Sequence, residues 1–331
     1  DHITEQFPPV EWRQAPRVEP TQPEPEEART SVTVNRAVPR IASLIHSSET
    51  VTGEPIAIIG MSGVFPEAPD LASYWANLLA GRESIGLIPS DRWDYRRYFD
   101  SEIELPRPGT SYAPWGGFVD DPFGFDNRFF NITPADAIVI DPQERMLLET
   151  VWHTLEDAGL PRGVLRRGAD DELGEDVGVF VGTTSQTYQF WGVEQALGEN
   201  PVLTNSSPWS LANRISYFFD FSGPSLPIDT ACSSGLSAVH LAVESIRCGE
   251  CSSAIAAGVN LFLHPLKYAS MCQMKMLSPT GRLSAFGAAA DGFVPGEGVA
   301  AVLLKSLSRA IADGDRIRAV IRSSAVNHGG R

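Results

Sequence analysis

The sequence predicts an α/β fold in which a mostly parallel sheet is covered by helices on both faces. Short apolar runs, typical of strands buried on both faces, recur at residues 55–60, 177–181, 252–259 and 299–305. Segments with apolar residues at helical spacing lie between these runs, and this alternation favours parallel pairing. The length of 331 residues allows about two domains or one large one.

The first strand follows Glu54 and ends at Gly60. A helix is predicted from Asp70 because apolar side chains recur at helical spacing up to Gly81, which lies beyond its end. Residues 85–131 are rich in aromatic residues, proline and glycine without a sustained period, so they are expected to form an ordered insertion outside the central sheet. The apolar residues of the helix are Leu71, Tyr74, Trp75, Leu78 and Leu79.

The next helix has a well-marked start. Asp141 is predicted as the N-cap, with Pro142 at the first helical position and Glu144 at the capping-box position. Gly159 marks the end of this helix. Its inward-facing stripe is expected to comprise Leu147, Leu148, Val151, Trp152 and Leu155.

Residues 1–53 differ in composition from the rest of the chain. They combine many glutamates with seven prolines and only scattered large apolar residues, so they cannot bury enough surface to offset the entropy of ordering. We interpret them as a Pro/Glu-rich interdomain linker. Because the sequence does not begin with methionine, we expect a longer polypeptide with another domain upstream.

Composition excludes several classes of function. The net charge of −15 and the pI near 4.8 argue against nucleic acid as a partner, since phosphate binding needs a basic surface. No apolar run approaches the roughly 18 residues that cross a bilayer, so no membrane contact is expected. Four cysteines at irregular spacing do not resemble a disulfide framework, which favours a reducing cytoplasm.

Cys232 is the candidate nucleophile. The segment from Ile228 to Gly235 is expected to run from a strand through a tight turn into a helix that ends at Gly249. The positive end of the helix dipole and its unpaired amides would favour a thiolate at Cys232, and the same amides could hold the oxyanion of an attacked thioester. On this argument alone, a small buried cysteine that only packs remains the alternative.

The flanking residues resemble a known family. The letters DTACSS at residues 229–234 resemble the active-site motif of β-ketoacyl synthases. The resemblance extends in order over residues 54–331 to ketosynthase domains of modular polyketide synthases. The forms VPGEG and NHGG resemble ketosynthases served by separate acyltransferases. The other matching segments are EPIAIIGMSGVFP, IPSDRWD, FFNITPADAIVIDPQERMLLETVWHTLEDAGL, GRLSAF, AADGFVPGEG and NHGGR.

The resemblance implies a thiolase-like, layered α-β-α-β-α fold built from two related halves and usually found as a homodimer. Residues 54–315 would form the N-terminal half and residues 316–331 the first strand of a truncated C-terminal half. The activity implied is acyl transfer: Cys232 accepts an acyl chain from an acyl carrier protein, and decarboxylation of a malonyl-type extender drives Claisen condensation. No bound cofactor is implied, because phosphopantetheine on the carrier holds the substrates; other polyketide synthase domains are expected partners.

Further site residues follow from the same resemblance. Thr230, Ala231 and Ser233 flank the nucleophile, whose own backbone N–H would be one oxyanion donor, while Phe293 and Glu297 lie in the loop expected near the reacting centre. Phe286 matches the family, but Gly287 replaces the aspartate that usually follows it. Methionines at positions 271, 274 and 276 could line an acyl tunnel, since thioethers adapt to varied chains, or could be core residues; Met271 is the one we select as substrate-lining.

The family's two catalytic histidines and its lysine belong to the second half of the fold. His240 lies eight residues after Cys232, about 12 Å along a helix, which is outside hydrogen-bond reach. His328 and His153 are interpreted as structural and rim residues. We therefore expect a C-terminal ketosynthase half, on the same or a separate polypeptide. The alternative function is a non-condensing ketosynthase-like domain that transfers acyl chains or serves as a scaffold.

Three other motifs suggest different chemistry and are given little weight. Cys248 and Cys251 form a C-x-x-C pair, but a zinc site needs four ligands and no second pair follows at suitable spacing. The glycine-rich residues 291–298 lack the lysine and hydroxyl residue of a nucleotide loop. Thr230 stands where a hydrolase nucleophile elbow has glycine. No metal site is therefore expected.

Overall fold

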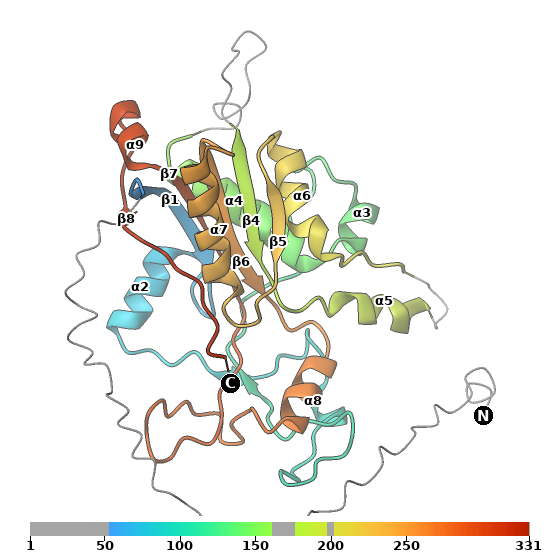
Figure 1. Ribbon diagram of the computed structural model, residues 1–331. Helices are drawn as coiled ribbons and strands as arrows, with labels where there is room; N and C mark the ends of the chain where they lie inside the picture. Colours follow the sequence, from blue (N-terminus) through green and yellow to red (C-terminus); the bar gives the residue numbers. More distant parts are fainter. Residues whose placement is uncertain (1–52, 161–175, 197–201, 331) are drawn as a thin grey trace, which may run out of the picture. The chain divides into compact units, whose positions relative to one another are not determined.

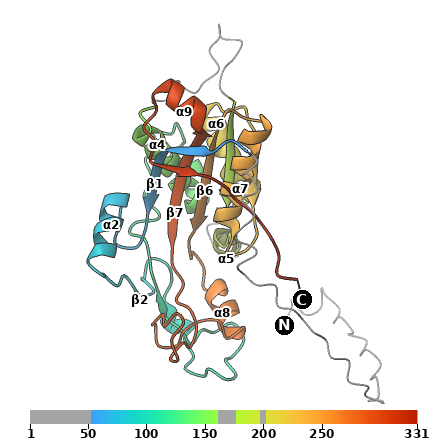
Figure 2. The same ribbon diagram turned by 60° about the vertical axis from the view of Figure 1, so that its left-hand side comes forward.

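A computed structural model describes residues 53–160, 176–196 and 202–330 (Figure 1). Within these residues the chain forms a six-stranded sheet of order β5-β4-β6-β7-β1-β8. The first strand in sequence, β1, thus lies between the last two, β7 and β8 (Figure 2). The strands are β1 (Ile56–Val64), β4 (Val177–Gly182), β5 (Ser225–Ile228), β6 (Ser253–Asn260), β7 (Gly298–Ser306) and β8 (Ala319–Ile321).

The expectation of a mostly parallel sheet is wrong, because the sheet is mixed. Strand β4 pairs in parallel with β5 and β6, whereas the β6–β7, β7–β1 and β1–β8 pairs are antiparallel. Parallel pairing needs a connection that crosses over a face of the sheet. The chain between β6 and β7 instead leaves the end of the sheet, forms α8 (Leu266–Gln273), and returns to pair beside β6.

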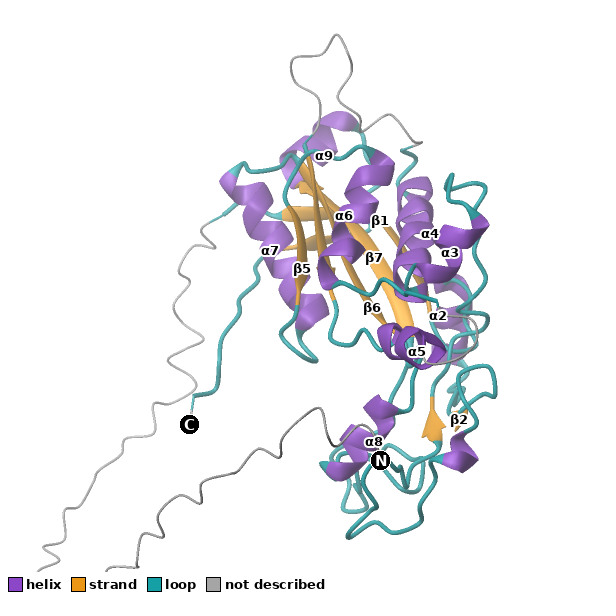
Figure 3. Ribbon diagram, turned by 90° about the vertical axis from the view of Figure 1, so that its right-hand side faces the viewer, coloured by secondary structure: helices purple, strands orange, loops and turns teal. Residues whose placement is uncertain are grey.

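Helices cover both faces of the sheet, as predicted. Helices α4 (Pro142–Asp157) and α6 (Pro208–Phe219) pack on one face and α7 (Ser234–Cys248) on the other (Figure 3). Successive side chains of β1 point to opposite faces of the sheet, and both faces are apolar. Ala57 and Ile59 join the core beneath α4 and α6, while Ile56 joins the core beneath α7. Short helices complete the layers: α3 (Pro134–Val139), α5 (Tyr188–Ala196) and α9 (Leu307–Asp313).

The start of α4 confirms its predicted cap but not its capping box. Asp141 Oδ1 accepts a hydrogen bond from the Gln143 backbone N–H at 2.9 Å. The Glu144 side chain does not bond back to the Asp141 N–H; it accepts from Ser210 Oγ and pairs with Arg214 of α6. The predicted stripe is buried at Leu147, Leu148, Val151 and Leu155, and Trp152 packs against the same core.

Helix α2 (Leu71–Leu79) is capped by Asp70, which accepts from the Ser73 N–H at 2.7 Å. Tyr74 of its predicted apolar stripe stacks on Phe65, but the described part of the chain leaves most of the stripe uncovered. Trp75 is 61% exposed and Leu79 is 71% exposed. The helical spacing therefore predicts the helix correctly, but its apolar face lies open.

The insertion predicted over residues 85–131 is only partly separate, because Val119 and Phe130 join the core beneath α4 and α6. Its first part, residues 85–118, forms a lobe beyond one end of the sheet. It contains the two-stranded ribbon β2 (Gly86–Leu87) and β3 (Trp115–Gly116) and the short 3₁₀ helix η1 (Tyr95–Arg97), none of which joins the six-stranded sheet. We call residues 85–118 and 262–296 the insertion lobe (Figure 3). Its own apolar core comprises Ile88, Tyr112, Ala113, Phe262, Tyr268, Met271, Cys272 and Leu277.

The boundaries predicted from sequence are only partly visible. The predicted linker, with His2 and His46, lies outside the described residues apart from Gly53. Strand β8 pairs antiparallel with β1 and forms one edge of the sheet, so the division at residue 315 stays a prediction. In the described ranges, no helix combines the length and apolar character needed to cross a membrane.

Candidate active site

Cys232 lies between the end of β5 and the first turn of α7, as the sequence predicts. The turn is anchored where β5 ends, because the Thr183 N–H donates to the Ile228 carbonyl at 3.0 Å. Ser233 occupies the N-cap position of α7 without a side-chain capping hydrogen bond, and Gly249 ends the helix in a left-handed conformation. Cys232 is a free, exposed thiol. The alternative of a buried packing cysteine is therefore wrong.

Hydrogen bonds hold the turn in an unusual backbone conformation. Ala231 has a φ of 55°, a left-handed value that costs a residue with a Cβ about 1–3 kcal/mol. Asp229 Oδ1 accepts from the Ala231 N–H at 2.9 Å, and Ser234 Oγ donates to the Ala231 carbonyl at 2.6 Å. Ser233 Oγ donates to the Thr230 carbonyl at 2.8 Å. These bonds fix the residue that directly precedes the nucleophile.

Gly182 lets the first turn of α7 approach the sheet closely. A Cβ at this position, at the end of β4, would lie 2.5 Å from the Ser234 carbonyl carbon and 2.6 Å from the Gly235 nitrogen. Real side chains do not approach backbone atoms so closely. The absence of a side chain at residue 182 therefore sets where α7, and with it Cys232, sits on the sheet.

Cys232 opens into a cavity of about 550 Å³ between the end of the sheet and the insertion lobe. Five of the predicted site residues line it: Ala231, Cys232, Met271, Phe293 and Glu297. The other two, Thr230 and Ser233, take part in the hydrogen bonds of the turn. A larger cavity of about 700 Å³ lies at α3 and α6, but its lining contains no cysteine, serine, threonine or lysine, so we place the site at Cys232.

The three methionines lie around the cavity, and one of them is also a core residue. Met271, Met274 and Met276 all line the cavity, where Phe65 and Phe293 add aromatic surface. Met271 is also buried in the core of the insertion lobe, whereas Met274 and Met276 are exposed. The cavity thus has an apolar wall on the side of the insertion lobe, suited to a hydrocarbon chain.

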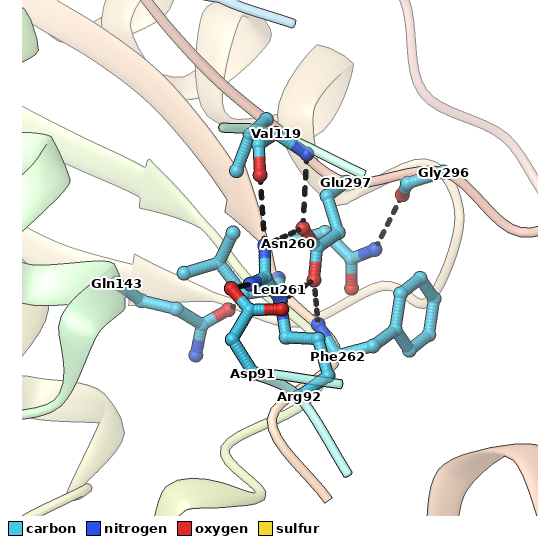
Figure 4. Close-up of polar contacts among 9 residues, drawn as sticks. All are labelled: Asp91, Arg92, Val119, Gln143, Asn260, Leu261, Phe262, Gly296 and Glu297. Atoms are coloured by element: carbon cyan, nitrogen blue, oxygen red, sulfur yellow. Dashed lines mark hydrogen bonds and ion pairs between the residues drawn. The ribbon is translucent and has the colours of Figure 1, made fainter. Parts of the chain in front are cut away.

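Glu297 lines the cavity with a side chain that is fully buried and paired (Figure 4). Its two oxygens accept from Arg92, at 3.0 Å from Nε and 2.7 Å from Nη2. They also accept from the backbone N–H groups of Val119, at 3.1 Å, and Phe262, at 2.9 Å. A buried carboxylate with this many donors is fully compensated, so Glu297 is held rigidly.

Sequence reasoning missed four polar residues at or near the cavity. Gln143 joins two loops, donating to the Ser185 carbonyl at 2.8 Å and accepting from the Leu261 N–H at 3.1 Å. Asn260 donates to the Gly296 carbonyl at 2.8 Å, and Lys267 lines the cavity. Arg92 is the fourth. Arg92 and Gln143 lie within segments that carry the family resemblance, and this resemblance was the one feature of the sequence that could have identified them.

No histidine of the described part of the chain lines the cavity around Cys232. His240 contacts Ser324 Oγ at 2.9 Å, and His153 pairs with Glu156 on the surface. His328 Nδ1 accepts from the Gly330 N–H.

The two cysteines of the C-x-x-C pair, Cys248 and Cys251, are free thiols. Cys251 is buried beside Ser245, and burial raises the pKa of its thiol.

The chain belongs to the β-ketoacyl synthase family. Residues 53–310 match the family described as "Beta-ketoacyl synthase, N-terminal domain". The chain is 48% identical over 278 residues to polyketide synthase PksL of Bacillus subtilis, and 44% identical over 280 residues to polyketide synthase ThaG of Burkholderia thailandensis. These matches cover 84% and 85% of the chain but only 6% and 5% of those much longer proteins.

Solved ketosynthase domains share the fold. The oxazolomycin ketosynthase domain OzmH KS7 of Streptomyces albus superimposes with a TM-score of 0.79 at 50% identity. The ketosynthase from module 6 of the bacillaene synthase of Bacillus subtilis gives 0.71 at 40% identity. The matches cover 84% and 81% of this chain and 46% and 43% of those domains, so the chain spans about half their length. The predicted thiolase-like α/β fold is confirmed.

Proposed function

We propose that this chain is the nucleophile-bearing part of a polyketide ketosynthase, a condensing acyltransferase. The single observation that carries the proposal is the exposed Cys232 thiol, held in a strained, hydrogen-bonded turn at the start of α7 and open to an apolar cavity. The forms VPGEG and NHGG favour an assembly line served by separate acyltransferases. The substrates are acyl thioesters on the phosphopantetheine arm of an acyl carrier protein.

The proposed reaction has two stages at Cys232. The Cys232 thiol gives up its proton and attacks the thioester carbonyl as the thiolate, while the Cys232 N–H donates to the oxyanion. The carrier sulfur then leaves and takes up the proton that Cys232 released. A malonyl-type extender on a second carrier then loses carbon dioxide, and the resulting carbanion attacks the acyl group on Cys232. The cysteine sulfur leaves, and the product is a β-ketoacyl chain on the second carrier. The methionine wall would accommodate the hydrocarbon part of the acyl group.

The second stage requires histidines that we assign to a complementary C-terminal half, on the same or a separate polypeptide. Exposed apolar surface supports such a partner. Leu236, on the outer face of α7, is 78% exposed, and the apolar face of α2 is also open. Strand β8 leaves a sheet edge with free pairing capacity. Finding the chain alone as a soluble monomer with no such partner would refute this part of the proposal.

Further partners follow from the same proposal. Strand β5 forms the opposite edge of the described sheet, and exposed side chains at Trp209, Tyr217 and Leu226 lie on β5 and on the neighbouring α6, which supports a homodimer. Other polyketide synthase domains would supply and consume the acyl chains. The free thiols of the described residues fit a reducing, cytoplasmic compartment.

Intact-protein mass spectrometry after addition of an acyl thioester tests the first stage. We expect one acyl group on the wild type and none on Cys232→Ala. Cys248→Ala is the matched control, because Cys248 is the other exposed thiol of the described residues, and it should retain acylation. Acyl transfer that survives Cys232→Ala would overturn the proposal. Adding a malonyl carrier and the C-terminal half then separates condensation from acyl transfer alone, the non-condensing alternative.

A further inference from the structure

The Arg92–Glu297 pair lies where the insertion lobe joins the sheet. Val119 directly follows the first segment of the lobe, Phe262 begins its second segment, and Glu297 directly follows that segment. The Glu297 carboxylate accepts from the N–H groups of both Val119 and Phe262 (Figure 4). The chain passes between lobe and sheet at Val119, Phe262 and Glu297, and the buried Glu297 carboxylate links all three of these junctions.

Arg92 completes this junction from inside the lobe. Its guanidinium donates in bidentate fashion to both Glu297 oxygens and, through Nη2, to the Val119 carbonyl at 2.9 Å. Nη1 pairs with the exposed Asp91 at 2.6 Å. Backbone hydrogen bonds reinforce the contact, since the Gly117 N–H donates to the Pro295 carbonyl at 2.9 Å and the Glu297 N–H donates to the Gly117 carbonyl at 2.8 Å. A planar fork of donors fixes both distance and orientation, which a single ammonium cannot.

The two sides of the cavity come from the two parts that this pair joins. Cys232 belongs to the sheet and α7, whereas Met271, Met274 and Met276 belong to the insertion lobe. The distance between nucleophile and methionine wall therefore depends on how the lobe is held. We propose that Arg92 is a positioning residue that, through Glu297, sets the placement of the acyl-binding wall relative to Cys232. This inference rests on the proposed function.

Acyl chains of two lengths test the proposal in the chain together with its C-terminal half. An acetyl group needs only Cys232 and the oxyanion donor, whereas an octanoyl group must reach the methionine wall. In Arg92→Lys, which keeps the charge but loses the fork, we expect the octanoyl concentration for half-maximal acylation to rise about tenfold. The value for acetyl should stay within about twofold, and the rate of Cys232 alkylation by iodoacetamide should not change.

Arg82→Lys is the matched control, because Arg82 makes a similar two-oxygen contact with Glu67 on the surface, and neither residue lines the cavity. It should leave both acylation curves unchanged. Should Arg92→Lys not fold, Asp91→Ala decides the matter, since it removes only the outer partner of Arg92. It should raise the octanoyl value about threefold and leave acetyl unchanged.

The outcomes separate the two proposals. Unchanged octanoyl acylation in the folded variant, or an equal loss for acetyl and octanoyl, would overturn the positioning role while leaving Cys232 as the nucleophile. Wild-type protein that accepts neither acyl group on Cys232 would instead overturn the proposed function.

Discussion

Replacing Gly182 with alanine should misplace the nucleophile. The added Cβ would lie 2.5 Å from the Ser234 carbonyl carbon, whereas ordinary contacts begin at 3.4 Å. The first turn of α7 must therefore move by about 1 Å, a displacement that can reduce an enzymatic rate about a hundredfold. Overpacking of this kind costs about 1–3 kcal/mol of stability, so the protein should still fold.

The assay is the rate of Cys232 acylation by an acyl thioester, followed by intact-protein mass spectrometry beside a urea unfolding curve. Gly86→Ala is the control, because a Cβ at Gly86, in β2, would meet no atom within 4 Å. It should leave both the rate and the unfolding curve nearly unchanged. A Gly182→Ala protein that is acylated at the wild-type rate would refute the claim that this close approach places Cys232.

Two further predictions concern stability and assembly. Burial raises the pKa of Asp141 to about 6, so the folded state binds this proton more tightly than the unfolded chain. Protonated Asp141 therefore contributes about 3 kcal/mol to the free energy of unfolding below about pH 4. This contribution is lost as the pH rises through 6. The Asp141→Asn side chain can still accept from the Gln143 N–H, so this variant should lose only the pH dependence of the free energy of unfolding. The measurement is urea unfolding between pH 4 and 7, and an equal pH dependence in wild type and variant would contradict the prediction. Leu236→Asp should abolish co-purification with the C-terminal half. The control is Leu105→Asp, at an 83% exposed residue of the insertion lobe, which should not abolish it. Equal recovery of the C-terminal half with both variants would show that this half does not cover α7.

Local patterns predicted the long central strands and helices α2, α4 and α7, but not how the strands pair. The runs at β4, β6 and β7 are apolar because these strands are largely buried, and this is visible in the sequence. Their direction depends on whether each connection crosses a face of the sheet. The insertion lobe occupies the β6–β7 connection, and nothing local in residues 261–297 indicates that α8 is not a crossover helix.

In the candidate active site too, local sequence predicted some features, and tertiary contacts set the others. The place of Cys232 between a strand and a helix was predictable because these elements are contiguous in sequence. The partners of Glu297 were not, since Arg92 lies 205 residues away and pairs with it only through tertiary structure. Glu144 shows that tertiary contacts can also override a local motif: Arg214 and Ser210 engage the side chain that the sequence assigns to a capping box.

The position of β1 has a consequence for synthesis. Ile56 of this strand pairs with Ser306 on one side and Ile321 on the other. A nascent chain therefore cannot complete this sheet until residues 298–321 have followed β1 out of the ribosome, and pairings between such distant residues form slowly. Until then the apolar β1 strand stays unpaired and prone to aggregate, so a chaperone that shields residues 56–64 during translation would raise the yield of folded protein.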